Sequence, residues 1–260
     1  MFRRLGFLLA LLALAFVPFK AVLAADRVDL LLVLAADVSR SVDAQKFQLQ
    51  RDGYAAALSD PRVLEMIKSG PNHRIAVCLV EWSGMMSQKV VIDWTLIDGP
   101  KAAQQFGDRL LETPRSFADR TSISAGITFA MAQFARAPFE ATRRTIDVSG
   151  DGTNNSGDDV KQVRDQAIAA GVTINGLAIL SEHPLPHNPE HTNPPGGLAH
   201  YYRENVMGGP GAFVMEAKDF SSFGQALISK LIAEVATLPA THSVRSIRLA
   251  RMRGRPDFAD

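Results

Sequence analysis

The sequence predicts an α/β fold with a Rossmann-like, mostly parallel central sheet, one antiparallel edge strand and helices on both faces. Apolar runs of strand length alternate with segments of helical periodicity, which is typical of such folds. One run, residues 30–36, is apolar throughout, as expected for a strand buried on both faces. Two other runs are joined by a short connection, which indicates an antiparallel hairpin at one edge.

The first 24 residues have the layout of a secretory signal peptide. Arg3 and Arg4 precede an uncharged stretch, and small residues precede a predicted cleavage after Ala24. The alternative is an uncleaved membrane anchor, but the uncharged stretch is well short of the roughly 20 residues that a span needs. We therefore predict an exported protein, periplasmic or secreted, without stable membrane insertion after cleavage.

The remaining chain of about 236 residues is long enough for one large α/β domain, which we place at residues 26–237. Loss of Arg3, Arg4 and Lys20 changes the formal net charge from +1 to −2, which gives no reason to expect nucleic acid. The single cysteine, Cys78, lies in an apolar run and is expected in the core. Export without disulfides fits a bacterial periplasm. We expect the protein to be a monomer.

The first half of the domain contains clear helix boundaries. Asp43 is a suitable N-cap for the first helix, and Gly99-Pro100 favours the start of a later one, because proline suits the first helical position. The predicted elements are the strand 30–36, the helix 44–58, the strands 74–82 and 89–94, and the helix 101–111.

The second half continues the alternation and ends in a helix with one apolar face. Gly171 is a good C-terminal stop for the helix before it. Asp147 falls inside a predicted strand, where it could face the sheet edge or pair with Arg74 or Arg144. The predicted elements are the helix 121–137, the strand 143–149, the helix 160–170, the strands 172–180 and 212–216, and the helix 219–236.

Oxygen-bearing side chains at alternate positions follow the first strand. Asp37, Ser39 and Ser41 stand directly after its apolar run. Open α/β folds bind ligands where the chain leaves the carboxyl edge of the sheet, and small oxygen ligands at this spacing can converge on one hard cation. The stretch therefore predicts a strand that delivers a metal-binding loop.

The pattern Asp37-x-Ser39-x-Ser41 resembles the metal-ion-dependent adhesion site (MIDAS) of the von Willebrand factor type A (VWA) domain. The resemblance implies a VWA fold with two further site elements, a threonine that opens a helix and an aspartate after a later core strand. Thr121 and Asp151 match these elements. The third element departs from the family pattern of apolar, Thr or Ser, Asp, Gly, because the sequence Ser-Gly-Asp-Gly places an extra small residue before the acid.

The predicted metal ligands are Asp37, Ser39, Ser41, Thr121 and Asp151. Two carboxylates match the charge of a divalent cation, and hard oxygen donors favour Mg²⁺, Mn²⁺ or Ca²⁺ over zinc. With few anionic ligands, the metal keeps its Lewis acidity and an exchangeable water. In the resembled family, an acidic residue of the partner completes the coordination, so the resemblance implies a protein partner that presents an acidic residue.

The same residues also allow a purely structural interpretation. Ser39, Ser41 and Asp43 could cap the following helix, with Asp151 as a turn residue. The acids at 158–159 are alternative ligands, but their position before a helix suits capping and the helix dipole.

Two segments exceed a minimal domain. Residues 181–211, hereafter the insertion, are rich in Pro, Asn, Gly and His, and loops of this length tend to be functional or disordered. The insertion leaves the same sheet edge that carries Asp37, so we expect it beside the metal. Residues 238–260 contain five arginines. We predict a disordered tail there, with an acidic partner or lipid head groups as the alternative contact.

Three histidines of the insertion, His183, His187 and His191, recur at every fourth position. On a helix they would form a metal-binding face, but the interspersed prolines make that helix improbable. We predict an exposed irregular loop, with a second, transition-metal site as the alternative. Tyr201 and Tyr202, near the end of the insertion, could contact a partner or pack the insertion onto the domain.

The leading functional hypothesis is an exported protein-binding module that recognises its partner through a metal-bridged carboxylate. The rival is a divalent-metal-dependent hydrolase that polarises a phosphoryl or carbonyl group. The sequence has no G-x-S-x-G elbow, phosphate-binding glycine loop or H-E-x-x-H motif, so we expect no enzyme. A third possibility is an assembly subunit of a periplasmic complex, a role that related domains serve.

Overall fold

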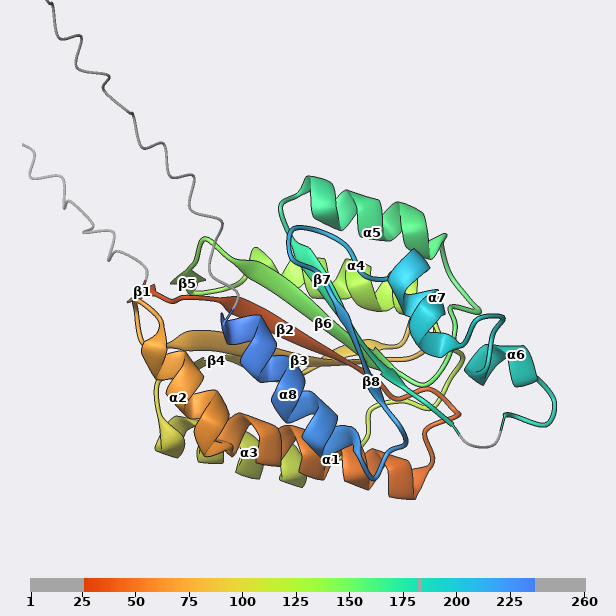
Figure 1. The fold of residues 1–260 in the computed structure, drawn as a ribbon, viewed down its shortest axis with the longest axis horizontal. Helices are drawn as coiled ribbons and strands as arrows, with labels where there is room; N and C mark the ends of the chain where they lie inside the picture. The colour runs from red at the N-terminus through yellow and green to blue at the C-terminus, as the bar shows by residue number, and fades with distance from the viewer. Residues whose placement is uncertain (1–25, 182–183, 237–260) are drawn as a thin grey trace, which may run out of the picture.

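The computed structural model describes residues 26–181 and 184–236. The predicted signal peptide, the Arg-rich tail and His183 lie outside the described residues. The central sheet has six strands in the order β4-β3-β2-β6-β7-β8 (Figure 1). β4 is antiparallel to β3, and the other neighbours are parallel. The predicted fold class is therefore confirmed, including its antiparallel edge strand.

The predicted elements are present, with shifts of up to four residues at their ends, and β1, α2, β5, α6 and α7 are additional. The strands are β1 Asp26–Arg27, β2 Leu31–Asp37, β3 Ile75–Trp82, β4 Gln88–Ile97, β5 Phe139–Glu140, β6 Arg144–Gly150, β7 Thr173–Ile179 and β8 Val214–Ala217. The helices are α1 Ala44–Ser59, α2 Pro61–Ser69, α3 Pro100–Glu112, α4 Ile123–Phe134, α5 Val160–Ala169, α6 Pro189–Thr192, α7 Leu198–Asn205 and α8 Phe223–Ala236.

Helices cover both faces of the sheet, with α1, α2, α3 and α8 on one side and α4, α5 and α7 on the other (Figure 1). The central strand β2 shows why its sequence is apolar at every position. Leu32 and Leu34 pack into the core on one side, and Val33 and Ala35 pack into the core on the other. None of the helices in the described part of the chain has the length and apolar character of a membrane span.

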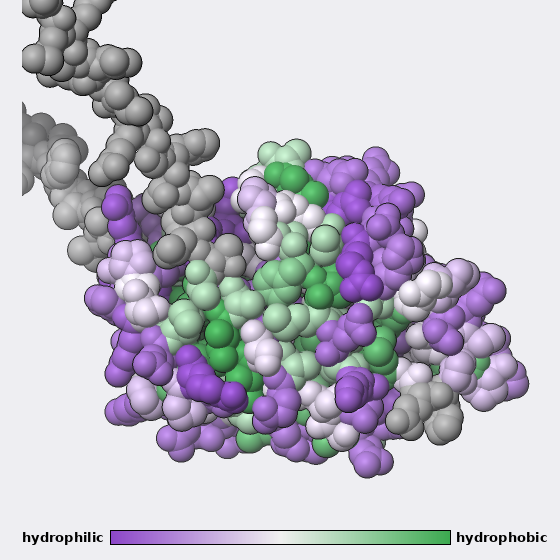
Figure 2. All heavy atoms as spheres, in the orientation of Figure 1, coloured by the Kyte–Doolittle hydropathy of each residue, from purple (hydrophilic) through white to green (hydrophobic). Residues whose placement is uncertain are grey.

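Apolar side chains also reach the surface along α8 and the edge strand β8. Figure 2 shows them in the centre of the face that α8 covers, with hydrophilic residues around them. Met215, Ile232 and Val235 are half-buried and pack against the large cluster beneath α8. This apolar surface is therefore the outer margin of the core on that side of the sheet.

A cluster of buried charges joins α8 to the sheet. The ammonium of Lys230 is fully buried and lies 2.7 Å from Asp147 Oδ1 of β6 and 2.5 Å from Glu234 Oε1. The prediction that Asp147 faces the sheet edge or pairs with Arg74 or Arg144 is wrong, because a side chain from the distant helix α8 provides the cation.

Lys230→Met retains most of the side-chain volume but leaves Asp147 and Glu234 buried without their cation. Breaking a buried ion pair by removing one partner costs about 3 to 5 kcal/mol. We expect the free energy of unfolding in urea to fall by about that amount. Ser229→Ala, at the exposed neighbouring position, should change it by less than about 0.5 kcal/mol. Equal effects of the two substitutions would contradict a stabilising role for the cluster.

Candidate metal-binding site

The five predicted ligands come from three segments at the carboxyl edge of the sheet. Asp37 is the last residue of β2, and Asp151 directly follows the parallel neighbour β6. The register pairs Ala36 with Ser149, so the chain leaves both strands at the same level. Thr121 lies just before α4, which begins with Ser122 as its N-cap.

Hydrogen bonds connect four of these residues in a chain. The backbone N–H of Ser39 donates to Asp37 Oδ1 at 2.7 Å, and the hydroxyl oxygens of Ser39 and Ser41 are 3.1 Å apart. The Ser41 hydroxyl donates to Asp151 Oδ1 at 2.5 Å. The structure therefore brings both carboxylates and both serine hydroxyls of the predicted site together.

Thr121 belongs to the same edge but has different partners. Its side chain is buried, its backbone N–H donates to Asn155 Oδ1 at 3.0 Å, and its Oγ1 lies 3.2 Å from His191 Nε2. No hydrogen bond among the described residues joins Thr121 to the other four. The structure thus places Thr121 outside this hydrogen-bonded chain, on the side where the insertion lies.

The extra small residue before Asp151 has a steric explanation. Gly150 is the last residue of β6, and a Cβ atom there would lie 2.9 Å from Asp37 Oδ2 and 2.6 Å from Tyr202 Oη. Any side chain at this position would push into the Asp37 carboxylate. The glycine therefore allows β6 to run close to Asp37 and to deliver Asp151 into the same site.

The two carboxylates are buried and repel each other. Burial, and then the charge of Asp151, raise the pKa of Asp37 from 3.8 to about 7. Asp37 Oδ2 is buried and accepts no hydrogen bond from the described residues. The nearby cation is Lys46, whose ammonium donates to the Ser41 carbonyl at 2.7 Å and lies 3.5 Å from Asp151 Oδ2.

These features fit a divalent cation. The site combines two adjacent carboxylates with neutral hydroxyls, and all of these groups are hard oxygen ligands. One carboxylate oxygen, Asp37 Oδ2, accepts no hydrogen bond from the described residues. In the described part of the chain, no three His, Cys, Asp or Glu side chains are grouped as a metal site. The predicted ligand set instead combines two carboxylates with three hydroxyls.

The alternative in which the predicted ligands only cap helices applies to other residues of these loops. Asp43 alone caps α1 by accepting from the backbone N–H of Lys46, and Asp159 caps α5. Asp158 is exposed. The capping roles are therefore filled without Ser39, Ser41 or Asp151.

Two side chains that the sequence analysis missed hold the backbone of the loop after β2. Arg115 Nη2 donates to the carbonyls of Val38 and Ser39 at 2.6 and 2.7 Å, and Gln50 Nε2 donates to the carbonyl of Asp37 at 3.1 Å. Neither residue belongs to a recognisable motif, because each acts through a contact distant in sequence. These hydrogen bonds hold the backbone of the loop that carries the predicted ligands Asp37 and Ser39.

The insertion is partly helical and lies at the site. It contains α6 and α7, with Pro189 in the first turn of α6, where proline is tolerated. The prediction of an exposed loop is wrong for His191, which is 5% exposed, although His187 is exposed as predicted. Tyr202 is fully buried, so it packs the insertion onto the domain.

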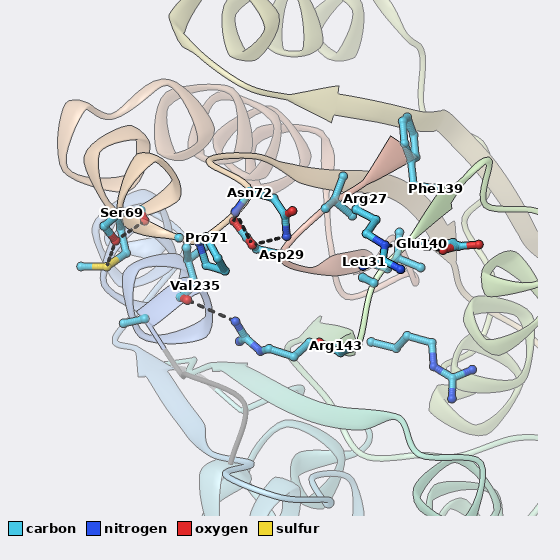
Figure 3. A pocket seen from close by; sticks show the side chains of 17 residues that line it. Arg27, Asp29, Leu31, Ser69, Pro71, Asn72, Phe139, Glu140, Arg143 and Val235 are labelled. Atoms are coloured by element: carbon cyan, nitrogen blue, oxygen red, sulfur yellow. Dashed lines mark hydrogen bonds and ion pairs between the residues drawn. The ribbon is translucent and has the colours of Figure 1, made fainter. Parts of the chain in front are cut away.

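An open pocket of about 810 Å³ lies at the other end of the sheet, where the strands begin (Figure 3). Its polar side chains bond to neighbouring groups. Asp29 accepts from the backbone and side-chain nitrogens of Asn72, and Arg143 donates to the carbonyl of Val235. We therefore base the candidate site on the carboxyl edge, where buried oxygens lack such partners.

Solved structures place the chain in a known fold class. It aligns with proximal thread matrix protein 1 (PTMP1) from the mussel byssus at 15% identity and a TM-score of 0.55, covering 81% of this chain and 49% of that one. A von Willebrand factor type A protein from Catenulispora acidiphila aligns at 14% identity and a TM-score of 0.51, covering 80% of this chain and 42% of that one. The pilus adhesin SpaC from Lactobacillus rhamnosus GG, in its open conformation, aligns at 13% identity and a TM-score of 0.54, covering 82% of this chain and 30% of that one.

The chain thus has a VWA-like fold and spans half or less of the length of these three proteins. It belongs to the family described as "Protein of unknown function (DUF1194)", whose model matches residues 27–239. No curated protein matches the sequence. At these low identities, the structural likeness establishes the fold alone.

The raised pKa of Asp37 predicts a pH dependence for the metal-free protein. A carboxyl group whose folded pKa is raised from 3.8 to about 7 contributes stability that is complete below pH 3.8 and is lost as pH rises through 7. Relative to Asp37→Asn, the free energy of unfolding in urea with chelator should fall by about 2 to 3 kcal/mol from pH 5 to pH 8. Parallel profiles of the two proteins would refute this assignment.

Proposed function

We propose that this protein is an exported module that holds one divalent cation and binds another protein through it. Asp37, Ser39, Ser41, Thr121 and Asp151 are the proposed ligands, and Mg²⁺ is the proposed ion, with Mn²⁺ or Ca²⁺ as substitutes. Two observations support the proposal: the hydrogen-bonded chain that joins Asp37 Oδ1 to Asp151 Oδ1, and the buried Asp37 Oδ2, which accepts no hydrogen bond from the described residues.

A related observation supports a cation at this edge of the fold. One structure of PTMP1 is described as having a zinc-occupied MIDAS motif, and it aligns at 16% identity and a TM-score of 0.54, covering 81% of this chain and 48% of that one. The ligand set here differs from a typical zinc site, because its donors are carboxylate and hydroxyl oxygens.

The proposed partner presents an acidic residue. A divalent cation balanced by two carboxylates and neutral hydroxyls remains a Lewis acid, and it supplies a position at which a carboxylate can replace water. The partly exposed ammonium of Lys46 adds positive charge next to Asp151. Both features favour an anionic group of a protein partner. They serve equally in adhesion and in the assembly of a larger complex.

We propose binding rather than hydrolysis as the activity. His191, the histidine that lies beside the site, is buried and held between Thr121 and Thr153. In this position it supports the site instead of presenting a free base to a substrate. Turnover of p-nitrophenyl phosphate or p-nitrophenyl acetate that is lost in Asp37→Asn would overturn this proposal in favour of a hydrolase.

Calorimetric titration of chelator-treated protein with Mg²⁺, Mn²⁺ and Ca²⁺ tests the metal site. We expect one site in the wild type and no measurable binding in Asp37→Asn or Asp151→Asn, because each removes one of two anionic ligands. Asp158→Asn, an exposed acid in the same loop, is the matched control and should bind as the wild type does. Circular dichroism verifies that the variants fold. Absence of binding to the wild type would refute the proposed site.

Water-proton relaxation of the Mn²⁺-loaded protein tests carboxylate recognition. A glycine-flanked peptide with one glutamate should lower the relaxation enhancement, because its carboxylate displaces a metal-bound water. The same peptide with glutamine should leave the signal unchanged. If the two peptides behave alike while Mn²⁺ stays bound, the proposed mode of partner recognition is wrong.

A further inference from the structure

The insertion is attached to two of the loops that carry the proposed ligands, and His191 makes both attachments. Its Nε2 lies 3.2 Å from Thr121 Oγ1, and its Nδ1 lies 3.3 Å from Thr153 Oγ1. Its backbone carbonyl accepts from the Thr153 N–H at 2.9 Å. One residue of α6 therefore bridges the loop before α4 and the loop after β6.

The hydrogen-bond network determines how the imidazole is protonated. The Thr121 N–H donates to Asn155 Oδ1, which directs Asn155 Nδ2 toward His191 Nδ1 at 3.4 Å. An amide nitrogen only donates, so Nδ1 must accept and the neutral ring carries its proton on Nε2. His191 Nε2–H then donates to Thr121 Oγ1.

This donation leaves the Thr121 hydroxyl oxygen with a remaining lone pair and a restricted orientation. An outer partner of this kind orients a metal-bound hydroxyl, because an isolated hydroxyl rotates and loses entropy when it coordinates. Gly152, next to Asp151, makes the close approach possible, since a Cβ there would lie 2.3 Å from His191 Nε2. The ring thus rests directly against the backbone of the Asp151 loop.

We propose that His191 is a positioning residue of the metal site, and that it couples cation binding to docking of the insertion segment 184–193. The inference rests on the proposed metal site. His191 orients the Thr121 hydroxyl without itself coordinating the cation. The cation in turn fixes Thr121, which strengthens the attachment of α6. Cation binding and docking of the insertion therefore stabilise each other. The insertion forms part of the surface that a partner meets only while the insertion itself is docked.

The test compares metal affinity in three variants by calorimetry. Loss of an outer-shell partner typically weakens metal binding about 10- to 100-fold, which is the result expected for His191→Ala. His191→Gln places an amide N–H near the position of Nε2 and should restore affinity to within about 3-fold of the wild type. His187→Ala, an exposed histidine of the same insertion, is the matched control and should bind normally.

Hydrogen exchange provides a second readout, which compares the wild type with His191→Ala. Adding Mg²⁺ to the wild type should slow amide exchange in the segment 184–193, and the effect should disappear in His191→Ala. Thermal unfolding of the metal-free proteins separates a loss of coupling from a general loss of stability. A His191→Ala protein that unfolds at the same temperature as the wild type but binds the metal more weakly supports the positioning role of His191.

Two results would overturn the inference while leaving the proposed metal site intact. The first is unchanged metal affinity in His191→Ala, and the second is metal binding to the wild type without slower exchange in the segment 184–193. A wild type that binds no cation overturns both proposals together. The wild-type titration therefore distinguishes the failure of the site from the failure of the coupling.

Discussion

The burial of the Asp37 carboxylate at the end of the central strand is the constraint on which the site depends. A buried carboxylate is costly unless it is paired or hydrogen-bonded. One oxygen of Asp37 receives the Ser39 N–H, whereas the other receives no donor from the described residues, and the charge of Asp151 adds to the cost. An arrangement of this kind favours a cation, because a cation relieves both the desolvation and the repulsion.

The second buried carboxylate of the sheet shows the contrasting solution. Asp147 on β6 is also fully buried and also has a raised pKa of about 7, mainly because of burial. There the chain supplies its own cation, since Lys230 lies 2.7 Å away and is itself inaccessible to solvent. No ion pair among the described residues involves Asp37, and the ammonium of Lys46, whose side chain is 29% exposed, lies 3.5 Å from Asp151 Oδ2. The cluster around Asp147 therefore contains its own buried cation, whereas the pair of Asp37 and Asp151 is bonded only to the partly exposed Lys46 among the described cations, which suits the proposed metal ion.

Close backbone approach and distant supports make the site rigid. Gly150 allows β6 to pass beside the Asp37 carboxylate, and Arg115 holds two carbonyls of the loop after β2. The insertion adds His191 on the remaining side. Ligands held from several elements lose little entropy when they coordinate, which is the physical basis of pre-organisation.

The sequence determined the local features of this protein. The apolar run of β2, the alternation of strands and helices, the N-cap at Asp43 and the spacing of Asp37, Ser39 and Ser41 all depend on neighbouring residues, so their patterns are readable in one dimension. The α/β fold class followed from these patterns, and the resemblance of the Asp37 motif to a known family implied the VWA-like form of it. The motif resemblance also pointed to Thr121 and Asp151, which the structure places at the same edge of the sheet.

Only the tertiary structure decided which distant side chains meet. Nothing local marks Lys230 as the partner of Asp147 or Arg115 as the support of the loop after β2, because both contacts join segments far apart in the chain. His191 was misjudged for the same reason. The prolines around it correctly argued against a long helix, but they carry no information about burial. Its position against Thr121 and Gly152 depends on how the insertion folds back over the carboxyl edge of the sheet.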